Sequence, residues 1–117
     1  MTVESAPAQA ALARSQSWPH FVTLLYDEAV SVLPSLGQFD LIFADAPGGK
    51  WDRLDLTVEA LRPGGFLLVD DMTPEGWWEE EQREKQRQVA QALLSHADLV
   101  STEMEWATGV ILCVRKH

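Results

Sequence analysis

Apolar runs and amphipathic stretches alternate along the whole chain. Runs rich in β-branched, aromatic and aliphatic residues predict strands, and they fall at residues 2–3, 20–26, 39–45, 66–71, 99–106 and 109–115. Apolar residues at helical spacing predict helices, and these fall at residues 7–15, 27–36, 51–61 and 79–95. In the last of these helices, Val89, Ala92 and Leu93 are expected to face inward. The sequence Arg-Pro-Gly-Gly at 62–65 is expected to end the third helix.

This alternation indicates an α/β fold. Strands that are continuously apolar are typical of a parallel sheet buried on both faces by crossover helices. The last two runs are separated only by Ala107 and Thr108, so they predict a closing hairpin that adds one antiparallel strand. No repeat or linker is apparent, and residues 1–117 are expected to form a single domain.

Composition excludes several classes of protein. The hydrophobic fraction is 46% and the charged fraction 23%, which is ordinary for a globular domain. A net charge of -9 disfavours nucleic acid as a partner, because phosphate would be repelled. Cys113 is the single cysteine and cannot form an internal disulfide. We expect neither a membrane span nor a leader peptide, and therefore a cytoplasmic protein.

Five acidic residues fall where the predicted strands end. In an open α/β sheet, ligands bind beyond the carboxyl ends of the strands. The acids at these positions are Glu4, Glu28, Asp45, Asp70 and Asp71. Clustered carboxylates repel one another, so they usually bind a cation or accept hydrogen bonds from a ligand. The alternative is that each acid caps the N-terminus of the helix that follows it.

The order of the sequence blocks carries a resemblance. The blocks TVESAP, AQAALARS, VTLLYDEAVSVLPSL, FDLIFADAPGGK, LRPGGFLLVDDM and WATGVILCVRK are similar to those of class I S-adenosylmethionine-dependent methyltransferases. They resemble most the O-methyltransferases of the catechol O-methyltransferase type. The resemblance implies a three-layer, Rossmann-like, mostly parallel sheet. It also implies S-adenosylmethionine as the cofactor and a hydroxyl of a small molecule as the methyl acceptor.

The resemblance also assigns roles to the cofactor-binding residues. Glu4 matches the acid that accepts hydrogen bonds from the ribose hydroxyls. Glu28 matches the acid that contacts the adenine amine, although Asp27 stands where the family commonly has glycine. Asp45 is also expected to contact the cofactor and to take part in catalysis.

The remaining roles concern the acceptor. Asp45, Asp70 and Asp71 match the ligands of Mg²⁺ or another divalent cation, where the family's third ligand is commonly Asn. Lys50 matches the general base; the alternative is an exposed lysine in a loop. Trp77 and Trp78 are expected to wall an aromatic acceptor pocket; the alternative is that they pack under the long loop.

One departure from the family pattern concerns the cofactor. These methyltransferases hold the cofactor's methionine portion with a glycine-rich loop after their first strand, and none of the seven glycines here forms G-x-G-x-G. The first strand, its loop and its helix are absent from the matching blocks. In the family that strand is central, so its absence opens a gap with unpaired edges. We expect a neighbouring strand to close the gap, or a partner chain, from a homo-oligomer or another protein, to fill it.

Three functions therefore stay open at this point. The first is methyl transfer from S-adenosylmethionine to a small-molecule hydroxyl, with or without a metal ion. The second is a truncated, inactive methyltransferase-like module for protein interactions. The third is a receiver-like phosphoacceptor domain, which the chain order disfavours because Asp70 and Asp71 follow Asp45 instead of preceding it.

Overall fold

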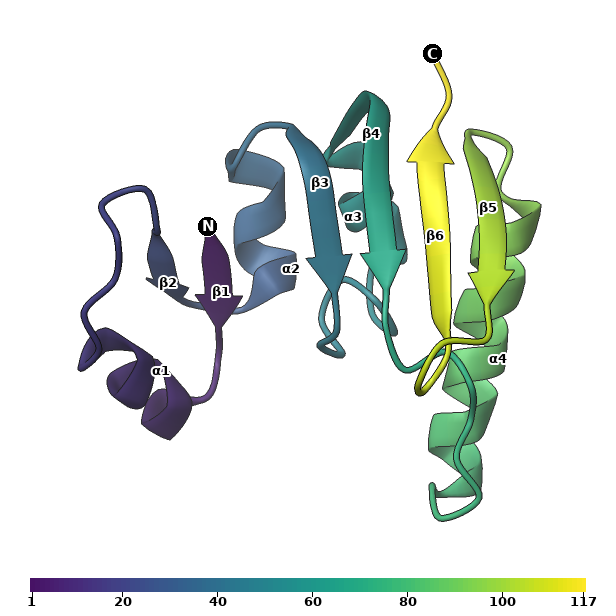
Figure 1. Ribbon diagram of the computed structural model, residues 1–117, viewed down its shortest axis with the longest axis horizontal. Coiled ribbons are helices and arrows are strands. Elements are labelled where there is room, and N and C mark those ends of the chain that lie inside the picture. Colours follow the sequence, from purple (N-terminus) through teal and green to yellow (C-terminus); the bar gives the residue numbers. More distant parts are fainter.

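The computed structural model describes all 117 residues, which form two sheets side by side (Figure 1). The smaller sheet consists of two parallel strands, β1 (Thr2–Glu4) and β2 (Leu24–Tyr26). The larger sheet has the order β3-β4-β6-β5, and its strands are β3 (Phe39–Ala44), β4 (Leu61–Val69), β6 (Val110–Arg115) and β5 (Leu99–Met104). β3 and β4 are parallel, whereas β6 is antiparallel to both of its neighbours. The predicted α/β fold, mostly parallel with one antiparallel strand from the closing hairpin, is confirmed.

Helices connect the strands as the alternation predicted. They are α1 (Pro7–Arg14), α2 (Ala29–Val32), the 3-10 helix η1 (Leu33–Ser35), α3 (Leu54–Glu59) and α4 (Glu80–Ser95). α1 begins at Pro7, whose fixed φ suits the first turn. α4 begins with a capping box between Glu79 and Gln82. None of these helices combines the length and the apolar character needed to cross a membrane.

The hydrophobic core lies on one face of the larger sheet. Leu67, Ile111 and Cys113 are fully buried there against Val58 of α3 and Leu93 of α4. Figure 1 shows both helices on the same side of the sheet. Alternate strand residues point to the opposite face. The larger sheet and the helices α3 and α4 therefore form two of the three predicted layers, and the opposite face of this sheet carries no helix.

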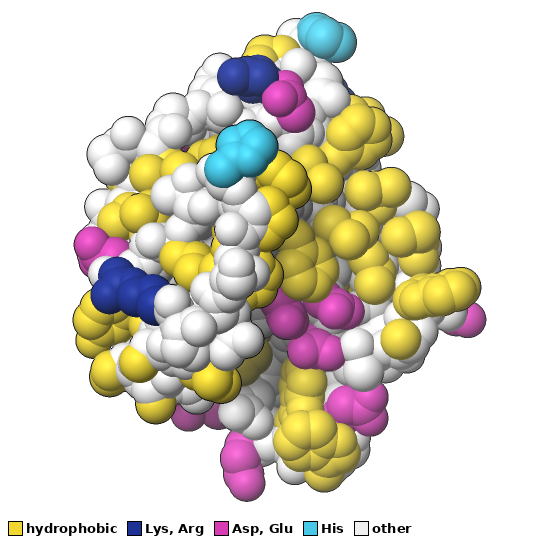
Figure 2. Space-filling view, turned by 60° about the vertical axis from the view of Figure 1, so that its left-hand side comes forward, with side chains coloured by type: hydrophobic (Ala, Val, Ile, Leu, Met, Phe, Trp, Pro, Cys, Tyr) yellow, Lys and Arg dark blue, Asp and Glu magenta, His cyan; other side chains and the backbone are white.

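The opposite face of the larger sheet is apolar and open. The pairing places Leu41, Phe66, Val114 and Val100 in one row across β3, β4, β6 and β5. Leu41 is 63% exposed and Val100 is 61% exposed. Figure 2 shows a broad hydrophobic area on the molecule beside a hollow that contains acidic side chains. Exposed apolar areas of this kind are uncommon on monomeric soluble proteins.

The gap predicted in the sheet remains open. β1 pairs only with β2, and β3 pairs only with β4. The expectation that a neighbouring strand would close the gap is therefore wrong. The physical reason is that β1 is already held, since it pairs with β2 over its whole length and contacts α1. Filling of the gap by a partner chain stays a prediction.

Two predicted boundaries in the first half are wrong. Residues 20–23 are not part of β2, because the chain turns there with the Val22 amide bonded to the Pro19 carbonyl. Phe21 in that turn is 74% exposed. The helix predicted at 27–36 is shorter and changes to a 3-10 turn at η1, where Pro34 cannot donate an α-helical hydrogen bond.

Two further differences lie in the second half. α3 ends at Glu59 and Leu61 already pairs with Phe39, so Arg-Pro-Gly-Gly belongs to β4 as a bulge and does not end a helix. Gly64 adopts φ +79 within this bulge, a conformation that favours glycine. On α4, Ala92 is exposed, and Gln86 faces inward together with Val89 and Leu93.

Candidate functional site

The predicted acidic residues lie along one edge of the molecule. β1 to β4 all run in the same direction, so their carboxyl ends share that edge (Figure 1). The open gap divides the acids into two groups. Glu4 ends β1 and Glu28 follows β2 of the smaller sheet, whereas Asp45, Asp70 and Asp71 follow β3 and β4 of the larger one.

Lys50 lies at the centre of the second group. Its side chain is only 3% exposed, and Nζ donates to the backbone carbonyl of Asp70 at 2.5 Å. The loop before it turns back on itself, because the amide of Gly49 donates to the Asp52 carbonyl and that of Trp51 to the Pro47 carbonyl. This turn carries Lys50 inward. The alternative of an exposed loop lysine is therefore wrong.

Burial and charge act in opposite directions on Lys50. Burial disfavours the ammonium and lowers the pKa of Lys50 below its ordinary value, while the negative charges of Asp71, Asp45 and Asp70 partly offset this effect. The pKa of Asp45 is raised, first by loss of solvation and then by the charges of Asp71 and Asp70. The site therefore holds a lysine that gives up its proton more easily than usual, beside a carboxyl that keeps its proton more easily than usual.

The backbone at Asp70 and Asp71 is fixed from several directions. Asp71 has φ +54, a left-handed conformation that costs energy in a residue other than glycine. The side chain of Asp70 accepts the Asp71 amide at 2.8 Å and lies 3.4 Å from the Thr108 hydroxyl, which donates to it. The amide of Met72 donates to the Gly109 carbonyl at 2.9 Å. The closing hairpin thus holds the two aspartates in place.

Gln86 is a residue of the site that our sequence-based prediction missed. It is fully buried on α4; its side-chain amide donates to the Asp71 carbonyl, and its oxygen accepts the indole N–H of Trp51. It therefore connects the aspartate turn to the loop that carries Lys50. Its spacing of three and seven residues from Val89 and Leu93 on the inward face of α4 would have revealed it.

A pocket of about 220 Å³ brings these residues together with two tryptophans. Asp45, Lys50 and Asp71 lie on its wall, and so do Trp77 and Trp78. The two indole rings meet edge to face, with 5.9 Å between their centroids. Trp77 is 79% exposed, so packing under the loop does not describe it, whereas Trp78 is half-buried. A role of the two rings in binding an aromatic acceptor stays a prediction.

The residues do not form a recognisable metal centre. No group of three or more His, Cys, Asp or Glu side chains is arranged to hold a metal ion. Asp70 directs one carboxylate oxygen to the Asp71 amide and the Thr108 hydroxyl, and Lys50 supplies a positive charge beside the acids. A divalent cation at Asp45, Asp70 and Asp71 remains a prediction that this arrangement does not support.

The two acids of the smaller sheet are separate from this pocket. Glu4 accepts the Ala6 amide through Oε1 at 2.8 Å at the start of α1. Glu28 precedes α2, makes no capping hydrogen bond and is exposed. The structure thus places Glu4 and Glu28 on one side of the gap and Asp45 on the other.

Comparison with known proteins gives a result at the level of the fold. No family model and no curated protein matches the chain. Solved structures do match. The chain superimposes with a TM-score of 0.79 on an SAH-bound methyltransferase from Podospora anserina, at 19% identity, covering 98% of this chain and 59% of that one. A protein from Klebsiella pneumoniae assigned as an O-methyltransferase gives a TM-score of 0.78 at 24% identity, covering 98% and 60%.

An O-methyltransferase from Bacillus cereus in complex with SAH gives the same TM-score, 0.78, at 19% identity, covering 97% of this chain and 61% of that one. The chain has a methyltransferase fold. The structural resemblance confirms the fold that the sequence blocks implied. The chain nevertheless spans only about three-fifths of the length of these proteins.

Proposed function

We propose that these residues form the acceptor side of an S-adenosylmethionine-dependent methyltransferase that acts on a hydroxyl of a small molecule. The observation that carries the proposal is the pocket in which buried Lys50 lies beside Asp45 and Asp71, at the carboxyl ends of parallel strands, in a methyltransferase fold. Ligands of open α/β sheets bind at this edge.

Lys50 is the base in this proposal. Its lowered pKa increases the fraction of neutral amine, which can accept the proton of the acceptor hydroxyl. The hydroxyl oxygen then attacks the transferred methyl carbon, and the bond from that carbon to its carrier breaks. Asp45 and Asp71 stabilise the ammonium formed on Lys50. Trp77 and Trp78 provide flat apolar surfaces against which an aromatic acceptor can be oriented.

When bound, S-adenosylmethionine supplies the methyl group on a positively charged sulfur. Glu4 suits the ribose hydroxyls because only its Oε1 is bonded within the chain, which leaves the other carboxylate oxygen available. Glu28 is exposed and free to accept an amine. The proposal uses no metal ion.

Calorimetry tests the cofactor part. S-adenosylmethionine and S-adenosylhomocysteine are titrated into the chain, each with and without Mg²⁺. We expect measurable heat for both, and a reduced affinity for Glu4→Gln. Absence of heat under every condition would contradict cofactor binding by this chain.

A transfer assay tests the base. Label from methyl-labelled S-adenosylmethionine is followed onto catechol, with Lys50→Met compared with Lys116→Met, a change at an exposed lysine. We expect Lys50→Met to lower the rate about 10²- to 10⁴-fold and the control to leave it unchanged. Equal rates for the two variants would remove Lys50 from the mechanism.

The second candidate is an interaction module without activity. It is favoured by the open gap between β1 and β3 and by the absence of G-x-G-x-G. Binding of neither cofactor form, together with no transfer to catechol, would favour this second function.

A further inference from the structure

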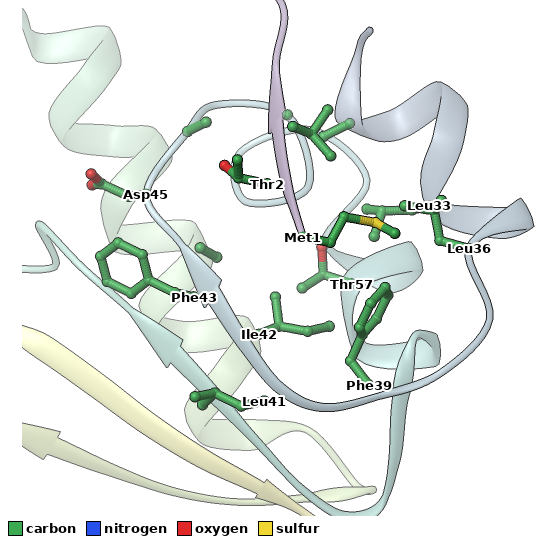
Figure 3. A pocket seen from close by; sticks show the side chains of 15 residues that line it. Met1, Thr2, Leu33, Leu36, Phe39, Leu41, Ile42, Phe43, Asp45 and Thr57 are labelled. Carbon is green, nitrogen blue, oxygen red and sulfur yellow. The ribbon is translucent and has the colours of Figure 1, made fainter. Parts of the chain in front are cut away.

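Thr57 is a buried polar residue that the proposed mechanism does not use. It belongs to α3, is 2% exposed and precedes Val58 of the hydrophobic core. Figure 3 shows Thr57 on the wall of a cavity of about 310 Å³ between the two sheets. Burial of a hydroxyl is costly unless it is hydrogen-bonded. The Thr57 hydroxyl donates to the backbone carbonyl of Gly49 at 2.6 Å, and it therefore ties α3 to the loop that carries Lys50.

This hydrogen bond fixes the peptide unit that leads into Lys50. Because a peptide unit is planar, the Gly49 carbonyl and the Lys50 amide move as one body. The Lys50 amide donates to the Pro47 carbonyl at 3.2 Å, in a turn whose third residue, Gly49, has φ +83. The Gly49 carbonyl accepts the shorter bond, from Thr57. Both polar atoms of the unit are held, and so is the point from which the Lys50 side chain starts.

The loop lies directly against α3 and η1 at Gly49. A Cβ atom on Gly49 would come within 2.7 Å of Thr57 Oγ1 and within 3.4 Å of Leu33 Cδ1. The loop therefore has no room to move closer to α3. If the Thr57 bond is lost, the loop can move only away from α3, and Lys50 moves with it.

The position of Lys50 decides whether it can act as a base. Its Nζ lies at the end of a flexible four-carbon stem and donates to the Asp70 carbonyl at 2.5 Å. A general base must come within about 2.6–3.2 Å of the hydroxyl from which it takes the proton. The Asp70 carbonyl holds the tip of the stem, and Thr57 holds the backbone at its start. A misplacement of about 1 Å can lower a catalysed rate about 10²-fold.

Gln86 supports the pocket in a different way. Its side chain bonds to the Asp71 carbonyl and to the Trp51 indole, so a change at Gln86 disturbs both the aspartate turn and the lysine loop. The Thr57 hydroxyl bonds to the lysine loop alone. A change at Thr57 therefore isolates the position of Lys50.

We infer that Thr57 is a positioning residue, whose hydroxyl holds the Gly49 carbonyl and thereby directs Lys50 into the pocket. The expected effect on methyl transfer rests on the proposed function, whereas the effect on Lys50 itself can be measured without transfer. Thr57 acts through Lys50 and is not a catalytic residue.

Two substitutions separate the hydroxyl of Thr57 from its shape. Thr57→Val keeps the volume and removes the hydroxyl, whereas Thr57→Ser keeps the hydroxyl and removes a methyl group. Gly49→Ala attacks the same contact from the loop, and it tests the inference even if Thr57→Val does not fold. The matched control is Ser101→Ala, which removes a hydroxyl that donates to the Leu93 carbonyl at 2.8 Å elsewhere in the larger sheet. Circular dichroism identifies the variants that fold.

Competitive labelling with acetic anhydride, followed by mass spectrometry, reports the position of Lys50 without methyl transfer. Lys116 is exposed and serves as the internal standard, whereas Lys50 is 3% exposed and should react slowly in the parent chain. We expect the relative labelling of Lys50 to rise at least about tenfold in Thr57→Val and Gly49→Ala. It should change by less than about twofold in Thr57→Ser and Ser101→Ala.

Transfer to catechol reports the consequence for catalysis. We expect Thr57→Val to lower kcat about 10- to 100-fold and to change the KM for catechol less than about twofold. Thr57→Ser should retain at least about a third of the parent kcat, and Ser101→Ala should leave kcat unchanged. A raised KM with unchanged kcat, or equal losses in Thr57→Val and Thr57→Ser, would overturn the inference.

The two measurements distinguish failure of the proposed function from failure of the positioning role. If the parent chain transfers no methyl group, the proposed function is rejected, and the labelling alone decides whether Thr57 positions Lys50. Unchanged labelling of Lys50 in Thr57→Val and Gly49→Ala would overturn the inference, whether or not the chain is active. Raised labelling with an unchanged kcat would also overturn it, because Lys50 would then move without consequence.

Discussion

The two sheets of this molecule differ in how they are stabilised. Every residue of the hydrophobic core cluster lies between Val58 and Cys113, in the part that contains the larger sheet. Before Gly49, Ala10 is the only buried residue. Two-stranded sheets are marginally stable by themselves. The part that carries the lysine pocket is therefore a folded unit, whereas the part that carries Glu4 and Glu28 depends on additional contacts.

The largest expected difference between the two sheets is in the free energy of unfolding lost when one side chain of each is truncated. Leu67→Ala removes a fully buried side chain of the larger sheet and should lower the free energy of unfolding by about 2–5 kcal/mol. Leu25→Ala changes a half-buried residue of the smaller sheet and should lower the free energy of the main unfolding transition by about 0.5 kcal/mol or less. Urea denaturation followed by circular dichroism measures both. Equal losses would show that the two sheets unfold as one unit.

An intermediate effect is expected from the connection behind the pocket. Gln86→Leu leaves the Asp71 carbonyl and the Trp51 indole without their buried partner, and should cost about 1–3 kcal/mol. Gln88→Leu is the matched control, since Gln88 bonds to Glu84 on the exposed side of the same helix.

Thermal unfolding measures the cost, and hydrogen exchange of the Met72 amide reports whether the aspartate turn loosens. If Gln86→Leu leaves the free energy of unfolding unchanged, α4 holds the pocket through its apolar residues alone.

The smallest effect concerns pH and belongs to the larger sheet alone. Because the pKa of Lys50 is lower in the folded state than its ordinary value of 10.5, the unfolded chain binds more protons between the two values. The free energy of unfolding should therefore rise with pH across this window. Denaturation at a series of pH values should show the rise in the parent chain and in Lys116→Met, and lose part of it in Lys50→Met. An unchanged slope in Lys50→Met would contradict the buried position of the lysine.

Asp45 should have the opposite effect at acidic pH, where it makes the free energy of unfolding fall as pH rises. Its folded pKa is raised above 3.8, so its favourable contribution is complete below that value and is lost as pH rises through the folded pKa. Asp45→Asn should remove this loss. The same pH series measures it, and a greater loss in the variant would contradict the assigned repulsion from Asp71 and Asp70.

The sequence predicted the larger sheet more successfully than the details of the pocket. The strand at 39–45 and the helices beginning at Pro7 and Glu80 follow from local patterns, and the hairpin follows from its short connection. The burial of Lys50 depends on a hydrogen bond to Asp70, twenty residues away in sequence, and no local pattern contains that information. The helical spacing of Gln86 from Val89 and Leu93 places it on the inward face of α4, but a polar residue is usually exposed on a helix, and the sequence does not show which partners bury it.

The open gap shows a different limit of prediction from sequence. Sequence blocks indicated that a central strand was absent, but not whether β1 would move to replace it. That outcome depends on the balance between the β1–β2 pairing and a new β1–β3 pairing, and the two have the same backbone chemistry. At the bulge before Phe66, likewise, helix-ending residues proved compatible with strand pairing because Leu61 could pair with Phe39 first.

The position of β6 has a consequence for synthesis of the chain. β6 is the last strand in the sequence, yet it lies inside the sheet between β4 and β5. During translation, β4 has no partner on that side, and Asp70 lacks its contact with Thr108, until Thr108 and β6 have left the ribosome. The support that β6 and Thr108 give to the lysine pocket is therefore added late, and a nascent chain paused before Val110 exposes the edge of β4.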